Sequence, residues 1–224
     1  MTLDEAMAAL RAGVEPGRAA QMAAYHKQSR EVLGIANPVL NDLARDWRQS
    51  LSVPERVALA EALWKTDVFE ARIVAAKTLT QARIRDDEDV WRLIASWVPD
   101  FDSWAIADHA CDAGKRRLVA DPRRIDTVED WTRSPHMWTR RAALVITLAW
   151  TKQNHPDAED LAIRDRVLGW AAGYVTDHDW FIQKAIAWWL RDLSKHDPER
   201  TRAFLDNHGT AMKPFARKEA ARHL

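Results

Sequence analysis

The sequence has one cysteine, Cys111, among its 224 residues. A lone thiol excludes a disulfide within the chain and is typical of a reducing compartment, so we expect a cytoplasmic protein. No run of about 18 uncharged apolar residues occurs, which excludes a membrane-spanning helix. The first residues, MTLDEAMAALRAG, carry acids early and lack a long apolar stretch, so they predict no secretory signal.

Signals for β-strands and for the common enzyme motifs are also missing. The sequence shows no sustained apolar–polar alternation and no Asn-Gly or Asp-Gly hairpin. It contains no nucleophile elbow, P-loop, dinucleotide fingerprint or HExxH motif, so the enzyme classes built on them are unsupported. Asp108, His109, Cys111 and Asp112 are potential ligands, but no second Cys or paired His motif accompanies them. We therefore expect neither a metal nor another cofactor.

Helical periodicity is present almost throughout. Apolar residues recur at spacings of three and four, and Pro residues follow capping residues, as in Ser52-Val53-Pro54-Glu55. The pattern predicts an all-α fold with about a dozen helices of 10–17 residues. Paired helices give units of roughly 35–45 residues, the period of HEAT-like repeats. We expect one domain over residues 1–224, an α-solenoid of about six HEAT-like pairs with a concave groove; a compact irregular bundle is the alternative. Helices are predicted to begin near residues 3, 17, 38, 54, 68, 87, 102, 122, 136, 158, 179, 198 and 213.

Acidic and basic side chains balance exactly in number but not in position. There are 33 Lys and Arg against 33 Asp and Glu, and a nucleic-acid partner usually requires a basic domain. Residues 1–112, however, hold 13 basic and 18 acidic side chains, whereas residues 113–224 hold 20 and 15. The second half therefore has a net positive charge. Ordinary solvated helix faces are the alternative explanation.

The densest chemical candidate is the segment around Trp104. If it is helical, Trp104 and Asp108 lie one turn apart on the same face, and Asp112 extends that face. A carboxylate beside an indole is partly desolvated, which strengthens its attraction for a cation. The alternative is a core Trp104 with Asp108 as a solvated or capping acid.

Two further segments combine indoles with cations. Arg140 and Arg141 point in different directions, so at most one shares the face of Trp138; a guanidinium there suits a carboxylate or a phosphate. An Arg–Asp brace between helices is the alternative. The second segment places two indoles and two cations on one helical face, a mixture typical of nucleic-acid surfaces. Cations extending from the edge of a core are the alternative there. Its residues are Trp180, Lys184, Trp188 and Arg191, and the opposing stripe of Phe181, Ala185 and Trp189 is expected to pack.

Taken together, these segments resemble the AlkD-like DNA alkylation-repair glycosylases, which are built from HEAT-like repeats. The resemblance extends over essentially the whole chain, and the Phe-Ile-Gln-Lys-Ala-Ile-x-Trp block is its most specific part. Trp180 differs from the Phe that is common in the family, and Ala36-Asn37 differs in the first DNA-facing turn. The matching segments are Tyr25-His-Lys-Gln, Leu33-Gly-Ile-Ala-Asn-Pro38, Trp104-x-x-x-Asp108, Trp138-Thr-Arg-Arg141-Ala-Ala, Phe181-Ile-Gln-Lys-Ala-Ile-Ala-Trp188 and Lys213-Pro-Phe-Ala-Arg-Lys-Glu-Ala.

The resemblance implies a monofunctional enzyme that removes cationic N3- and N7-alkylpurines from double-stranded DNA without base flipping. By position, Asp108 matches the catalytic carboxylate, and Trp104 and Trp188 match the indoles that flank the modified nucleotide. Arg141 matches an arginine that binds backbone phosphate, and Tyr25 and Trp180 match positions near the cleft. We expect a monomer that works on bacterial nucleoid DNA. A non-catalytic HEAT-repeat protein that binds DNA structure or a protein partner is the alternative.

Overall fold

The computed structural model describes all residues 1–224, and its regular structure is helical. Thirteen α-helices and four 3-10 segments are present, and strands are absent apart from one isolated bridge between Val14 and Ile35. The all-α prediction is therefore confirmed. The chain divides into two compact units, unit 1 (Met1–Asp121) and unit 2 (Pro122–Leu224). A single domain with a continuous concave groove stays a prediction.

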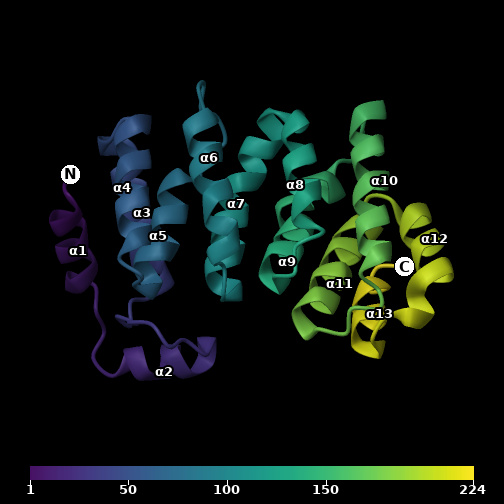
Figure 1. Cartoon of the computed structure of the whole chain (residues 1–224), viewed down its shortest axis with the longest axis horizontal. Coiled ribbons are helices and arrows are strands. Elements are labelled where there is room, and N and C mark those ends of the chain that lie inside the picture. The colour runs from purple at the N-terminus through teal and green to yellow at the C-terminus, as the bar shows by residue number, and fades with distance from the viewer. The chain divides into compact units, whose positions relative to one another are not determined.

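Unit 1 contains the first seven α-helices. In Figure 1, α2 lies crosswise to the upright helices α3, α4 and α5 of the same unit. The α-helices are α1 (Leu3–Ala12), α2 (Arg18–His26), α3 (Asn37–Ser50), α4 (Val53–Lys65), α5 (Phe69–Leu79), α6 (Glu88–Trp97) and α7 (Trp104–Ala120), with the 3-10 turn η1 (Val98–Asp100) before α7.

Unit 2 contains the remaining six α-helices and three 3-10 segments. The α-helices are α8 (Ile125–Trp131), α9 (Met137–Ile146), α10 (Ala158–Gly173), α11 (Trp180–Ser194), α12 (Pro198–His208) and α13 (Pro214–Ala220); the 3-10 segments are η2 (Pro122–Arg124), η3 (Leu148–Lys152) and η4 (Gly209–Ala211).

The predicted helix starts agree with the structure to within two residues, with one exception. The start predicted at residue 122 belongs to η2, and the α-helix itself begins at Ile125. The predicted lengths are wrong for three helices, because α2 has nine residues and α8 and α13 have seven each. For α2 the reason is local, since Gly17 precedes it and Lys27 ends it, both with positive φ.

The helix ends use the capping chemistry that the sequence indicates. At Ser52 the backbone N–H donates to the Glu55 carboxylate at 2.8 Å, which with Pro54 in the first turn starts α4. Asp157 accepts a bond from the N–H of Asp160 at 2.9 Å and starts α10 in the same way. Such side chains satisfy amide groups that the first turn of a helix leaves without partners.

One helix forms the centre of each unit. In unit 1, α5 packs against α3, α4 and α7, and it is buried on nearly every side. In unit 2, α11 packs against α9, α12 and α13. A mainly apolar helix belongs in a core, and in α5, which reads FEARIVAAKTL, only Arg72 and Lys77 stay partly exposed. None of the helices combines the length and apolar composition needed to cross a membrane.

The twelve tryptophans divide into a core group and a small group that retains solvent access. Trp64 and Trp97 show the core use, because their rings stack at 4.2 Å with an angle of 4° between planes. Trp104, Trp188 and Trp180 belong to the accessible group, and Trp180 is 51% exposed. The buried tryptophans are Trp47, Trp64, Trp91, Trp97, Trp150, Trp170 and Trp189.

A buried carboxylate fixes the turn that leads from α2 to α3. Glu70, in the first turn of α5, is fully buried and accepts bonds from three successive backbone amides: Leu33 at 2.8 Å, Gly34 at 2.7 Å and Ile35 at 3.2 Å. Gly34 has φ +83°, and a Cβ on it would lie 2.6 Å from the backbone nitrogen of Ala19. The turn therefore requires glycine, and it brings α2 within backbone contact of the segment before α3.

We expect Glu70→Gln to lower the free energy of unfolding by about 2–3 kcal/mol, because one carboxylate oxygen that accepts amide hydrogens becomes an amide donor in a buried site. Urea denaturation measures the change. Glu61→Gln is the matched control on the exposed face of α4, where loss of the i,i+4 pair with Lys65 costs about 0.5 kcal/mol or less. Equal effects of the two substitutions would contradict a structural role for the Glu70 carboxylate.

Candidate functional site

Trp104 and Asp108 occupy consecutive turns at the start of α7. The helix begins at Trp104, directly after the extended residue Ser103. Residues 105–107 are buried, whereas Trp104 and Asp108 are neither buried nor fully exposed. The structure thus places the indole and the carboxylate on one accessible face of one helix. The predicted geometry of this pair is therefore present, and Trp104 does not lie in the core.

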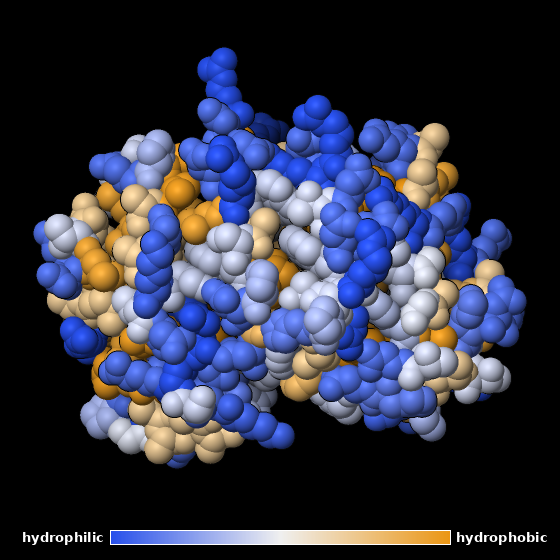
Figure 2. Space-filling model, viewed as in Figure 1, coloured by the Kyte–Doolittle hydropathy of each residue, from blue (hydrophilic) through white to orange (hydrophobic).

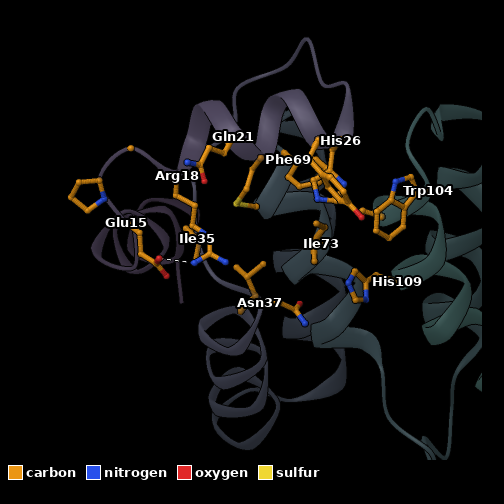
Figure 3. Close-up of a pocket in the computed structure, with 16 residues that line it drawn as sticks. Glu15, Arg18, Gln21, His26, Ile35, Asn37, Phe69, Ile73, Trp104 and His109 are labelled. Carbon is orange, nitrogen blue, oxygen red and sulfur yellow. Dashed lines mark hydrogen bonds and ion pairs between the residues drawn. The ribbon is translucent and has the colours of Figure 1, made fainter.

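Aromatic rings surround Trp104 within unit 1. The imidazole of His26 lies 5.0 Å from its ring and 4.8 Å from Phe69, and the Tyr25 ring meets the indole edge-on at 6.1 Å. Tyr25 itself is 72% exposed. In Figure 3, His26 and Phe69 lie together on one side of Trp104, which belongs to a different helix. This packing holds the indole in place from the N-terminal part of the chain.

A cavity of about 780 Å³ opens beside this aromatic cluster. Its walls come from α2, the turn after it, α3, α5 and α7, and Trp104 and His109 line its α7 side. Glu15 and Arg18 form an ion pair at 2.6 Å at another part of the wall (Figure 3). The volume lies within the range of small-molecule sites, and the lining mixes aromatic rings with a few polar groups, as such sites do.

Both histidines of the cavity are held in their neutral form at pH 7. Burial lowers the pKa of His26, with Glu70 acting in the opposite direction, and the His26 Nδ1 atom is buried without a hydrogen-bond partner. Burial, reinforced by the nearby Lys77 ammonium and opposed by Asp112, lowers the pKa of His109 to about 4. Neither imidazole therefore adds positive charge to the site.

In unit 2, Arg141 lies on α9 and is only 3% exposed. Its guanidinium carbon lies 5.6 Å from the centre of the Trp138 ring, so Arg141 is the arginine of the pair that shares this indole. Arg140 instead pairs with Asp177 at 2.8 Å. Trp138 in turn contacts Phe181 of α11 at 4.6 Å.

The predicted mixed face of α11 is present, and carboxylates accompany its cations. Trp188 is half-buried, and its indole N–H donates to Asp192 at 3.2 Å, which fixes the ring. Arg191 pairs with Glu219 and with Asp192, and Lys184 lies 3.9 Å from Glu219. Bonding from Arg191 lowers the pKa of Glu219, so this carboxylate is charged at neutral pH and reduces the positive potential of the face.

Trp180 extends this face at the start of α11. Its ring stacks on Phe215 of α13 at 5.9 Å, with an angle of 22° between planes. On the opposing stripe, Ala185 and Trp189 are buried as expected, whereas Phe181 is only half-buried between Trp138 and Trp180.

Within unit 1 the structure brings the ring of Tyr25 into contact with Trp104. Asp108 lies one turn after Trp104 on the same face of α7. Within unit 2 it gathers Trp180, Lys184, Trp188 and Arg191 on α11 and packs α9, which carries Arg141, against that helix. No group of three or more His, Cys, Asp or Glu side chains is arranged to hold a metal ion.

Sequence reasoning missed three residues that hold this site together: His26, Phe69 and Glu70. The signal for Glu70 was the only acid of a mainly apolar helix, because a buried carboxylate must find hydrogen-bond donors. His26 and Phe69 carried no such signal, because the contacts of Phe69 with His26 and of His26 with Trp104 join segments more than 30 residues apart in the chain.

The low pKa of His109 predicts a pH-dependent stability. Between pH 6.5 and 4, His109 is protonated in the unfolded chain but stays neutral in the folded protein. The free energy of unfolding therefore falls as the pH is lowered through this window. The cost reaches about 3 kcal/mol. His109→Gln should remove this component in denaturation curves at pH 7.5, 5.5 and 4.5, whereas His155→Gln, at an exposed position, should not. Parallel pH profiles for the wild type and His109→Gln would contradict the assignment.

The chain is similar to known DNA alkylation repair proteins. A family profile described as DNA alkylation repair enzyme matches residues 6–224. The structure resembles a predicted DNA alkylation repair enzyme from Enterococcus faecalis, with a TM-score of 0.79, 22% identity, and coverage of 94% of this chain and 96% of the other. It also resembles the crystal structure of AlkD2 from Streptococcus mutans, with a TM-score of 0.61, 19% identity, and coverage of 83% and 88%. None of the curated proteins compared with the chain matches it. Because the profile covers nearly the whole sequence, the chain belongs to the DNA alkylation repair enzyme family.

Proposed function

We propose that the chain is a monofunctional DNA glycosylase that hydrolyses the N-glycosidic bond of cationic N3- and N7-alkylpurines in duplex DNA. The observation that carries the proposal is the pairing of Trp104 and Asp108 on one accessible face of α7, beside an aromatic cavity. The products are the free alkylated base and an abasic site. The protein works as a monomer, without a cofactor, in the bacterial cytoplasm.

The chemistry needs little more than a negative charge and electron-rich rings. An alkylpurine that carries a positive charge is already a good leaving group, so no general acid has to protonate it. As the bond breaks, positive charge develops on the deoxyribose, and a nearby carboxylate stabilises that charge most when water is partly excluded. Asp108 supplies the carboxylate and orients the attacking water.

The indoles supply the second element. The face of the Trp104 ring attracts developing positive charge through its quadrupole. The contacts with His26 and Tyr25 fix the orientation of the ring. Trp188 has the same role in the proposal, supported by its half-buried indole, its bond to Asp192 and the family resemblance. Because rings and carboxylate act on the sugar, the base stays in the duplex and no flipping is required.

DNA binding is assigned to Tyr25, Trp180, Lys184, Arg191 and Arg141. Tyr25 and Trp180 are the two strongly exposed aromatic residues of the chain, and exposed rings can stack against nucleotides. The family resemblance alone assigns Arg141 a backbone phosphate near the lesion, because its side chain is only 3% exposed in the unbound protein. Lys184 and Arg191 contribute charge from α11. Figure 2 shows polar side chains over much of the face viewed, with apolar patches among them.

The decisive variant is Asp108→Asn, which keeps the shape of the side chain and removes its charge. We expect release of 7-methylguanine from an alkylated duplex to fall roughly 100-fold or more under single-turnover conditions. Affinity for the same duplex should change less than about threefold, because the carboxylate acts on the transition state and not on the bound DNA.

Asp89→Asn provides the matched control, with the same charge change on the exposed side of α6 in the same unit. Its release rate should equal that of the wild type. Undiminished release by Asp108→Asn would rule out the catalytic role of Asp108. A wild-type protein that binds DNA with a steep salt dependence yet releases no alkylated base would instead identify the non-catalytic DNA-binding alternative.

A further inference from the structure

A second cavity in unit 1, of about 380 Å³, lies where α3, α5 and α7 meet. It shares one lining residue, His109, with the aromatic cavity beside Trp104. Its other charged lining residues are basic, with one exception: Arg45 and Arg48 from α3, Lys77 from α5, Arg116 from α7, and the single carboxylate of Asp112. None of these residues has a role in the proposed base excision.

The charges around this cavity are not balanced by the protein. Arg48 donates to the backbone oxygen of Lys77 at 2.6 Å, and the Lys77 ammonium donates to the side-chain oxygen of Asn41 at 2.7 Å, so both cations bond to neutral groups. Arg116 forms no hydrogen bond or ion pair, and its Nε atom is buried. Three cations thus line one cavity without a carboxylate bonded to any of them.

The remaining charged groups offset these cations only in part: burial lowers the pKa of Lys77, and the nearby Asp112 carboxylate opposes that effect. Arg45 forms an ion pair with Asp42 at 2.8 Å, and its side chain is more than half exposed. Asp112 is 2.5 Å from Lys115 and so is already paired. Burial and the charges of Arg45 and Arg116 lower the pKa of Arg48, which shows that the cations repel one another. His109 is neutral at pH 7 and contributes no charge.

Like charges gathered in a concave, partly buried place cost free energy unless an anion offsets them. Guanidinium groups offer paired donors that suit phosphate oxygens, and an ammonium adds a compact charge. We propose that Arg48, Lys77 and Arg116 form a binding site for a phosphate group. If the phosphate belongs to DNA, the site rests on the proposed function and deepens it, because it adds a DNA-backbone contact whose α7 residue, Arg116, lies eight residues after Asp108.

Arg116→Gln is the first test, because Arg116 has no partner in the protein whose loss would disturb the fold. With an unmodified duplex, we expect affinity to fall about tenfold at low salt. The slope of log affinity against log salt should become shallower by about one. Arg92→Gln is the control: it removes the same charge from an exposed position on α6, where Arg92 pairs with Glu88 and Asp89, and should leave the slope unchanged.

Asp112→Asn tests the same site in the opposite direction. It removes the only carboxylate that lines the cavity, so DNA affinity should rise about threefold and the slope should steepen. A gain of affinity cannot result from partial unfolding, which separates a binding effect from a structural one.

Inorganic pyrophosphate distinguishes the two sources of the phosphate. If Arg116→Gln leaves the DNA slope unchanged but abolishes thermal stabilisation of the wild type by pyrophosphate, the site binds a free phosphate compound. If both substitutions leave DNA affinity, salt slope and pyrophosphate stabilisation unchanged, the phosphate site is wrong. Because unmodified DNA is the probe, these results are independent of base excision, and a failure of Asp108→Asn to reduce release would leave them intact.

Discussion

The contact between Glu70 and the turn at residues 33–35 determines how the first third of the chain is built. A fully buried carboxylate is costly, and here three backbone amides satisfy it without a cation. Because Glu70 lies next to Phe69, the same turn of α5 anchors the loop and supports His26. Two aromatic contacts then link Phe69 through His26 to Trp104, so the anchored turn and the indole on α7 belong to one connected set of contacts.

Both units are built around a central helix, but their accessible faces carry different side chains. The central helix is α5 in unit 1 and α11 in unit 2, and α5 is the more completely buried of the two. In unit 1 the accessible face of α7 carries a carboxylate and an indole, and cations gather further along the same helix. In unit 2 the accessible face of α11 carries indoles and cations, moderated by Glu219 and Asp192. A near-neutral chain can therefore hold local basic surfaces, because the balancing acids lie elsewhere or in fixed pairs.

The helices could be read from the sequence because each one carries local signals. Capping residues such as Ser52 and Asp157, and prolines in first turns, mark starts through interactions within a few residues. The spacing of Trp104 and Asp108 was likewise a local property. What could not be read was every contact that joins distant segments: Glu70 with Leu33–Ile35, His26 with Trp104, and the meeting of Arg48, Lys77 and Arg116. Helical spacing did separate Trp188 from Trp189, because it places the two indoles on different faces of α11.

Helix α2 contributes no buried residue, although it forms one wall of the aromatic cavity. A local opening of α2 would break its ring contacts, including the one between His26 and the fully buried Phe69, and the close approach of Ala19 to Gly34. The free energy for such a local opening is set by those few contacts and not by the stability of the unit as a whole. The width of the cavity is consequently a property that evolution can adjust by changing a handful of residues, while the rest of the helical scaffold keeps its stability.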